Sequence, residues 1–284
     1  MRVGPRHAPL AYRFVVTVLR PWLMAFTRRD WRGVEHLPRD RGFVAVSNHV
    51  SHLDAFVFAH FLNDAGIVPH FLGKIEVFRI PVLGAIVRAA DQIPVHRESG
   101  RASDSYAAAV AAIREGKCVG IYPEGTLTRE PDLWPMRGKT GAARVALETQ
   151  CPVVPVASWG AQDVLPPYGH RPSLLPRHTI SMRAAAPVDI SDLYDEPVTA
   201  EVLAEATERI MAALTAGVEE LRGERAPAVR YDPREHGLPV TGPPRSARRT
   251  RRSGPRGRGL PPQWADGSRE GSQDAGPDDG EDHT

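Results

Sequence analysis

Apolar residues recur along the middle of the chain in two patterns, short continuous runs and longer runs with helical spacing. Short runs bounded by turn residues are typical of buried strands, and the longer runs are typical of helices that cover a sheet. The pattern predicts strands at 42–47, 67–72, 93–95, 118–122, 153–157 and 180–184, the last an edge strand. It predicts helices at 52–62, 81–90, 103–115, 138–149 and 200–221. Strands that alternate with helices indicate an α/β fold, with a mostly parallel sheet flanked by helices.

The N-terminal stretch from Leu10 to Phe26 is apolar, but Arg13, Arg20 and Pro21 interrupt it. A membrane-spanning helix needs about 20 mostly apolar residues without such breaks, so we expect no span here. Arg13, Thr17 and Arg20 would share one helix face, with apolar side chains over much of the rest, as in a helix that lies in the membrane interface. A helix docked on the protein's own core has the same periodicity, and both interpretations stay open.

The chain changes character at about residue 226, where Pro, Gly, Arg and Ser replace the apolar periodicity. Such a segment cannot bury enough apolar surface to offset its conformational entropy, so we predict that residues 226–284 are disordered. An arginine-rich block (Arg245–Arg258) precedes an acidic end (Asp274–Asp282), and the net charge of +2 hides this segregation. The basic block suits anionic lipid headgroups or nucleic acid, and a solvated tail with no specific role is the plainer alternative. We expect a membrane surface as a partner and do not expect nucleic acid.

The length between these two ends, residues 31–225, suffices for one catalytic domain, which we expect to follow an amphipathic membrane-contacting segment at residues 1–30. The two cysteines, Cys118 and Cys151, fall in or beside predicted buried strands. Two cysteines in a chain of this length do not indicate a disulfide scaffold, and they fit a reducing compartment. With no recognisable secretory signal, the sequence predicts a cytoplasmic protein that is peripheral on the inner face of the cell membrane.

Candidate chemistry begins directly after the first predicted strand, in the segment Asn48-His49-Val50-Ser51-His52-Leu53-Asp54. An imidazole has an unperturbed pKa of about 6.5, so it can take a proton from an alcohol near neutral pH. A carboxylate on the other ring nitrogen fixes the tautomer and stabilises the imidazolium, and Asp54 could do this for His49. On a regular helix, residues five apart point about 140° away from each other. The two therefore meet only if His49 lies in the turn before a helix and Asp54 in its first turns.

His52 leaves two alternatives open, because it is a second candidate base and also a potential metal ligand. His49, His52 and Asp54 could together bind zinc and make the protein a metal-dependent hydrolase. No second cluster of His, Cys or Asp at ligand spacing stands out downstream in the sequence. We therefore expect no metal and no cofactor.

A second candidate segment, Tyr122-Pro123-Glu124-Gly125-Thr126, follows another predicted buried strand. Gly125 allows the backbone to approach a ligand, and the N–H groups of such a turn can bind an anion. A carboxylate beside a phosphate would repel it, so we expect Glu124 to accept from a hydroxyl or to pair with Arg97 or Lys74. Taken alone, the segment is best explained as an ordinary turn after a strand.

Together the segments resemble the glycerophospholipid acyltransferase family, of the 1-acyl-sn-glycerol-3-phosphate acyltransferase type. Four blocks stand in the family's order: His-x4-Asp within 48–54, Ile-Pro-Val-His-Arg at 93–97, Tyr-Pro-Glu-Gly-Thr at 122–126 and Val-Pro-Val-Ala at 154–157. The resemblance implies that His49 is the general base, that Asp54 orients it and that Arg97 contacts the acceptor's phosphate. The substrate-binding residues that it suggests are Asn48, Lys74, Arg97, Glu124, Gly125 and Thr126.

The resemblance implies transfer of an acyl group from acyl-CoA or acyl-carrier protein to the sn-2 hydroxyl of lysophosphatidic acid, which makes phosphatidic acid. The alternative acceptors are glycerol-3-phosphate and another lysophospholipid, and a non-catalytic lipid-binding protein is the alternative class. One departure from the family pattern is Leu127, which stands where an arginine usually follows the third block. Arg129 or Arg137 could take the place of that arginine.

Overall fold

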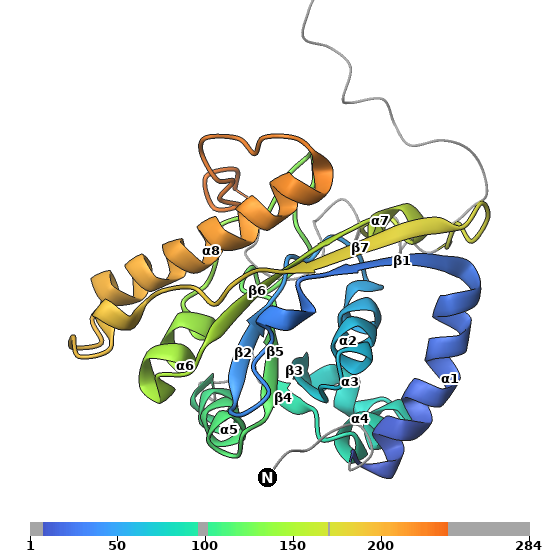
Figure 1. Cartoon of the computed structure of the whole chain (residues 1–284), viewed down its shortest axis with the longest axis horizontal. Helices are drawn as coiled ribbons and strands as arrows, with labels where there is room; N and C mark the ends of the chain where they lie inside the picture. Colours follow the sequence, from blue (N-terminus) through green and yellow to red (C-terminus); the bar gives the residue numbers. More distant parts are fainter. Residues whose placement is uncertain (1–7, 96–101, 170, 238–284) are drawn as a thin grey trace, which may run out of the picture. The chain divides into compact units, whose positions relative to one another are not determined.

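The computed structural model describes residues 8–95, 102–169 and 171–237. Seven strands form one sheet in the order β1-β7-β6-β2-β5-β3-β4 (Figure 1). Their bounds are β1 Thr27–Arg32, β2 Phe43–Val46, β3 Pro69–Lys74, β4 Ile93–Val95, β5 Cys118–Ile121, β6 Val153–Trp159 and β7 His178–Ala184. Neighbouring strands run parallel except for the antiparallel pair β6 and β7. The predicted α/β fold with a mostly parallel sheet is confirmed.

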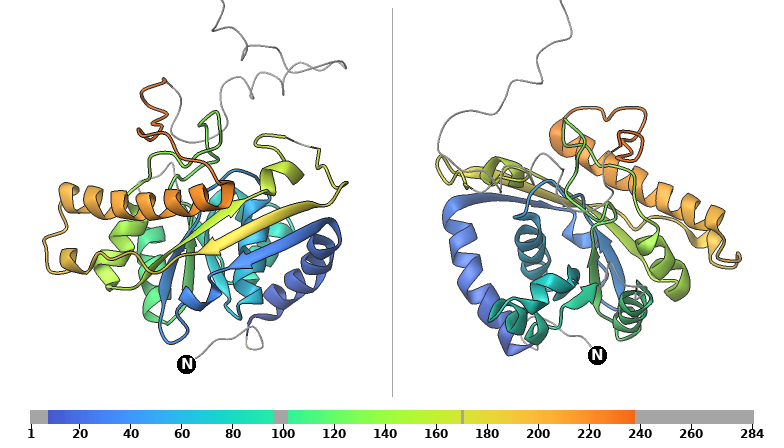
Figure 2. Two further views of the ribbon diagram at one scale, coloured as in Figure 1. Left: turned by 45° about the horizontal axis from the view of Figure 1, so that its top comes forward. Right: turned by 180° about the vertical axis from the view of Figure 1, so that it is seen from behind.

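Helices cover both faces of this sheet (Figure 2). They are α1 Leu10–Phe26, α2 Asp54–Asp64, α3 Ile75–Arg79, α4 Leu83–Ala89, α5 Ala102–Arg114, α6 Gly141–Thr149, α7 Ala161–Val164 and α8 Ala200–Arg222, with 3-10 turns at Val34–His36 and Ser191–Leu193. Residues of α5, α6 and α8 share one buried cluster with the sheet, and residues of α1, α2 and α7 share another. The core therefore has two halves, one on each face.

The central strand β2 joins the two halves of the core. Its sequence is Phe-Val-Ala-Val, and all four side chains are buried. Val44 and Val46 pack in the cluster with α5, α6 and α8, whereas Phe43 and Ala45 pack in the cluster with α2. A parallel strand covered on both faces has a continuous apolar sequence, which is why the pattern predicts it. The loop that follows β2 thus starts from a rigid, fully buried element.

The sequence predicts β7 as an edge strand, and this is wrong, because β7 lies between β1 and β6. The edge strand is β1, which the sequence does not predict. Its residues Thr-Arg-Arg-Asp-Trp-Arg carry charged side chains, and Thr27 is its one buried residue, so no apolar pattern marks it. Parallel backbone pairing with β7, from Thr27 opposite His178 to Arg32 opposite Arg183, holds it in the sheet.

The N-terminal helix α1 packs on the domain through Tyr12 and Leu23, which are buried. Asp64 at the end of α2 bonds to Arg20 of α1 (Nε to Oδ1, 3.1 Å) and to Arg29 of β1 (Nη1 to Oδ2, 2.7 Å). Because β1 runs across the boundary predicted at residue 30, α1 leads directly into the sheet. None of the described helices is long and apolar enough to cross a membrane.

Residues 226–237 are part of the fold, so the disordered segment predicted at 226–284 starts too early. The backbone N–H of Arg137 donates to Tyr231 O (2.9 Å), and Arg137 Nη1 bonds to Asp232 Oδ2 (2.9 Å). These contacts attach the segment after α8 to the loop before α6. The rest of the predicted tail, residues 238–284 with the arginine-rich block, lies outside the described residues.

Candidate active site

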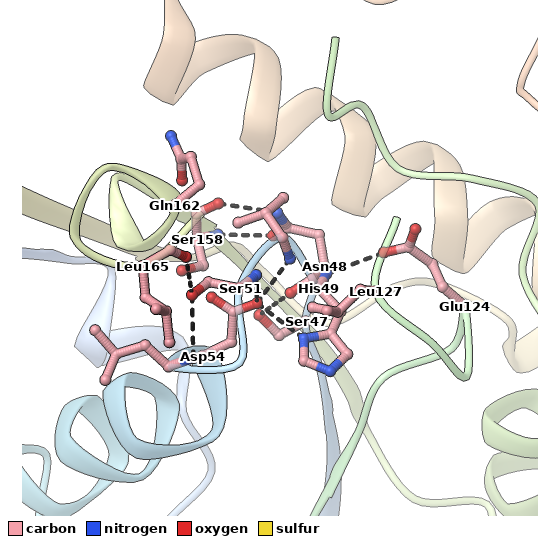
Figure 3. A network of polar contacts seen from close by, with 12 residues as sticks. Ser47, Asn48, His49, Ser51, Asp54, Glu124, Leu127, Ser158, Gln162 and Leu165 are labelled. Atoms are coloured by element: carbon pink, nitrogen blue, oxygen red, sulfur yellow. Dashed lines mark hydrogen bonds and ion pairs between the residues drawn. The ribbon is translucent and has the colours of Figure 1, made fainter. Parts of the chain in front are cut away.

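Two loops meet at the carboxyl ends of the neighbouring parallel strands β2 and β5. Residues 47–53 follow β2, and residues 122–128 follow β5. Two backbone hydrogen bonds join the loops: Ser47 N donates to Ile121 O (3.1 Å), and Thr128 N donates to His49 O (2.7 Å). In open parallel sheets, this edge is where ligands bind. Both candidate segments of the sequence therefore lie at one site (Figure 3).

His49 lies in the loop before α2, and Asp54 is the first residue of that helix. His49 Nδ1 is 2.8 Å from Asp54 Oδ2, so the predicted geometry is observed. The same Oδ2 accepts from the backbone N–H groups of Val50 and Ser51, each at 2.7 Å. A carboxylate oxygen can only accept, so its contact with Nδ1 places the ring proton of a neutral His49 on Nδ1. Nε2 then carries the lone pair that can take a proton from a ligand.

His49 is more exposed than Asp54, as expected for a base that must reach a ligand and a carboxylate that only orients it. The Asp54 side chain is 1% exposed and that of His49 is 19% exposed. Tyr122 covers one face of the imidazole, because its ring stacks on that of His49 with centroids 4.2 Å apart. The carboxylate is held and desolvated, while the imidazole keeps an accessible edge.

Glu124 supports the loop of His49 from the other side. It is buried, and its Oε1 accepts from His49 N (3.0 Å) while its Oε2 accepts from Met136 N (2.9 Å). Burial raises the pKa of the Glu124 carboxyl to about 8, although these two hydrogen bonds lower it. Both oxygens bind backbone, so Glu124 helps to position the His49 loop. Its bond to a substrate hydroxyl, to Arg97 or to Lys74 stays a prediction.

Gly125 makes the sharp turn that follows Glu124. Its φ of 71° is in the left-handed region, and its N–H donates to Tyr122 O (2.9 Å). A Cβ at this position would lie 2.8 Å from Lys139 Nζ, so the glycine also makes room for that ammonium group. The close neighbour at Gly125 is thus a side chain of this chain, and the approach of a ligand to its backbone stays a prediction.

Asn48 joins the His49 loop to β6 through two hydrogen bonds. Its Nδ2 donates to Ser158 O (2.9 Å), and its Oδ1 accepts from Ser158 N (2.8 Å). Ser51 Oγ donates to Leu165 O (2.7 Å) and ties the same loop to the end of α7. Asn48 is buried and uses both ends of its amide on backbone, so it holds the His49 loop in place, and its contact with a substrate stays a prediction.

The remaining predicted residues lie in different places. Lys74 is the last residue of β3, at the same sheet edge as the two loops, and Thr126 is half-buried in the second loop. Arg97 lies outside the described residues. Leu127 is buried.

The metal alternative finds no support among the residues that the structure describes. No three His, Cys, Asp or Glu side chains in these ranges gather closely enough to hold an ion. His52 is exposed, and its ring meets Tyr168 edge-on at 6.4 Å between centroids.

Sequence reasoning missed Ser158 and Met136, whose backbone groups hold Asn48 and Glu124. Both contacts span long stretches of chain, and backbone partners carry no residue-type signal. The one available hint was the strand at 153–157, since a strand beside β2 must end near the His49 loop. The missed contacts explain how the loops are held.

Part of the chain matches a known family and several known proteins. Residues 28–159, from β1 to the end of β6, match the acyltransferase family. A 1-acyl-sn-glycerol-3-phosphate acyltransferase of Brassica napus, described as chloroplastic, is 33% identical over 143 residues, which are 50% of this chain and 40% of that protein. A Bacillus subtilis protein of the same name is 33% identical over 129 residues, 44% of this chain and 60% of that protein.

A solved structure extends the likeness to the fold. The crystal structure of the 1-acyl-sn-glycerophosphate acyltransferase from Thermotoga maritima matches with a TM-score of 0.57 and 24% identity, over 76% of this chain and 80% of that one. The chain spans about half the length of the curated relatives it matches.

Proposed function

We propose that this chain transfers an acyl group from a thioester to the sn-2 hydroxyl of 1-acyl-sn-glycerol-3-phosphate, and the match of residues 28–159 to the acyltransferase family supports this. The product is phosphatidic acid, and the donor is acyl-CoA or acyl-carrier protein. The relatives' names support the acceptor. The observation that carries the proposal is the pair of His49 Nδ1 and Asp54 Oδ2 at 2.8 Å, with the imidazole partly exposed.

The proposed reaction is direct acyl transfer without a covalent enzyme intermediate. The acceptor hydroxyl oxygen attacks the thioester carbonyl carbon while His49 Nε2 takes the hydroxyl proton. The tetrahedral intermediate then collapses, the carbon–sulfur bond breaks, and the leaving thiolate receives the proton from the imidazolium. Asp54 stabilises that cation through Nδ1–H and prevents the ring from turning. General-base assistance of this kind contributes about 10²- to 10⁴-fold to the rate.

The test is release of free thiol from palmitoyl-CoA by the purified protein in the presence of lysophosphatidic acid. His49→Ala should abolish acceptor-dependent release. His52→Ala is the matched control, because His52 lies in the same loop and is exposed, and it should keep the activity. Release without acceptor would identify a thioesterase, and equal loss in both variants would exclude His49 as the specific base.

The acceptor is an amphiphile, and we propose that α1 brings the site to a membrane surface. Leu10, Phe14, Val18 and Trp22 recur at every fourth position and are 80%, 61%, 54% and 39% exposed. Residues with this spacing form one stripe along a helix. Val82, just before α4, is also exposed, and α4 packs beside α1. An exposed apolar stripe on a surface helix supports peripheral binding to a bilayer.

The buried residues of α1 decide which variants can test this membrane contact. Tyr12 and Leu23 are buried, so deletion of α1 would damage the fold. Substitutions within the exposed stripe leave these two anchors in place. They therefore separate loss of membrane contact from loss of structure.

A further inference from the structure

Three buried polar atoms near the candidate base have no hydrogen-bond partner among the residues that the structure describes. They are Asp54 Oδ1, the hydroxyl oxygen of Tyr122 and Ser158 Oγ. Asp54 and Ser158 are each 1% exposed, and the half-buried Tyr122 has its hydroxyl group inside. Roughly nine in ten buried polar groups in folded proteins have a hydrogen-bond partner, so these three atoms together require an explanation.

The two hydroxyl groups lie on the face of the sheet that α2 covers. Side chains alternate between the two faces along a strand, and Val154 and Val156 of β6 pack in the cluster with α2. Ser158 is two residues further along β6 and therefore faces the same way. In β5, Cys118 packs in that cluster, and Tyr122 at the end of the strand packs against it. Both hydroxyl groups are thus on the side of α2.

The Asp54 carboxylate lies between these two side chains. β2 stands between β6 and β5 in the sheet, and the loop after β2 leads into α2 at Asp54. The Tyr122 ring stacks on His49 with centroids 4.2 Å apart and meets Phe58 edge-on at 6.1 Å. Because Phe58 follows Asp54 by one turn of α2, the two share one helix face. Tyr122 therefore flanks the carboxylate from β5, and Ser158 flanks it from β6.

The chemistry of the three atoms is complementary. A carboxylate oxygen only accepts hydrogen bonds, whereas each hydroxyl group can donate one. Burial raises the pKa of the Tyr122 phenol well above its usual 10, and the charge of Asp54 adds to this effect, so the phenol keeps its proton. None of the three atoms bonds directly to another. A buried water molecule typically makes about three hydrogen bonds to polar groups of this kind.

We propose that Asp54 Oδ1, Tyr122 and Ser158 bind one water molecule, which donates to Oδ1 and accepts from the two hydroxyl groups. The water supplies a donor to Oδ1, as three N–H groups do for Oδ2. With donors on both oxygens, the carboxylate is kept from turning away from His49. Tyr122 and Ser158 are thereby positioning residues for the base. This role rests on the proposed acyl transfer, whereas the binding of the water does not.

The first test is a crystal structure of the wild-type protein at a resolution that shows ordered water. We expect one water molecule within hydrogen-bond distance of Asp54 Oδ1, the Tyr122 hydroxyl group and Ser158 Oγ. No water at these three atoms, or other partners for the two hydroxyl groups, overturns the proposal.

Thermal unfolding of Tyr122→Phe tests whether the hydroxyl group is bonded, because phenylalanine keeps the ring and removes only that group. Loss of a bonded hydroxyl group lowers the melting temperature, whereas loss of a buried one without a partner raises it. We expect a lower melting temperature, and an equal or higher one overturns the proposal. The crystal structure and this measurement need no transferase activity, so they test the water site even if the proposed function fails.

Steady-state kinetics tests the effect on the base. Tyr122→Phe and Ser158→Ala should each lower kcat about twofold to tenfold, the size of one hydrogen bond. KM should not change, because both hydroxyl groups are buried away from a substrate. The double variant should lose less kcat than the product of the two single losses, because both groups act on Asp54 through the same water.

Tyr106→Phe is the matched control, because Tyr106 is also half-buried and lies on α5, at the other face of the sheet. It should keep the wild-type kcat. Single losses that multiply in the double variant, or unchanged kcat in both single variants, overturn the positioning role. A loss in Tyr106→Phe as large as that in Tyr122→Phe overturns it as well.

Discussion

Replacing Glu124 by glutamine should make the protein less stable than wild type at acid pH and more stable than wild type at alkaline pH. Glu124 is 2% exposed, and burial raises the pKa of its carboxyl from 4.5 to about 8. Between these values the folded chain holds a proton that the unfolded chain has released, so the free energy of unfolding falls as pH rises through this window. At about 1.4 kcal/mol per pKa unit, the wild-type protein loses roughly 5 kcal/mol by about pH 8.

The glutamine variant has no proton to release at this position, so its stability lacks this slope. Its amide has one acceptor oxygen, whereas Glu124 accepts from both His49 N and Met136 N. One buried N–H group is then left without its partner, which costs about 1–3 kcal/mol at every pH. The variant should therefore be less stable than wild type near pH 5 and more stable near pH 9.

Urea denaturation of both proteins at several values between about pH 5 and pH 9 measures this crossing, because the difference between the two curves cancels the other titrating groups. Glu130→Gln is the matched control, since Glu130 Oε2 also accepts a backbone N–H, from Trp134 (2.9 Å) in the same loop region. A difference between wild type and Glu124→Gln that stays constant across this range, or grows in favour of wild type at high pH, would refute the reasoning.

Three further predictions concern activity and the turn. Asp54→Asn should lower kcat about 10²- to 10⁴-fold with little change in KM, because the amide removes the charge that stabilises the imidazolium; steady-state kinetics checks this, and unchanged kcat would contradict it. Phe14→Ser should lower turnover on anionic vesicles more than on detergent-dispersed acceptor. Val198 is an exposed residue away from α1, so Val198→Ser should change neither turnover. If Phe14→Ser lost the same fraction of turnover on both forms of the acceptor, a membrane role would be excluded. Gly125→Ala should cost about 1–3 kcal/mol of unfolding free energy, since an alanine there has a φ of 71° and its Cβ meets Lys139; a melting temperature equal to wild type would contradict this.

The sequence predicted those parts of the fold that depend on apolar burial. β2 and β5 are short buried runs covered on both faces, and their apolar residues are sufficient to identify them. The sequence did not predict β1, because β1 is a charged edge strand. Backbone pairing with β7 and the bonds of Asp64 to Arg20 and Arg29 hold it in place. Those partners come from other elements, and single-sequence periodicity does not register them.

The candidate site was predictable where it depends on neighbours in sequence. The contact between His49 and Asp54 follows from a strand, a turn and a helix in succession, and the structure has it at 2.8 Å. The roles of Asn48 and Glu124 were not predictable, because each binds backbone groups of a distant segment. A carboxylate that holds a loop and one that binds a ligand have the same residue type. The difference lies in the fold.

The central claim is that His49 is the base that makes the acceptor hydroxyl reactive. Mass-spectrometric detection of phosphatidic acid formed from palmitoyl-CoA and lysophosphatidic acid tests it directly, with wild type, His49→Ala and His52→Ala compared at equal protein concentration. Phosphatidic acid should accumulate with wild type and His52→Ala and fall by at least about 10²-fold with His49→Ala. Product formed at the wild-type rate by His49→Ala would contradict the account.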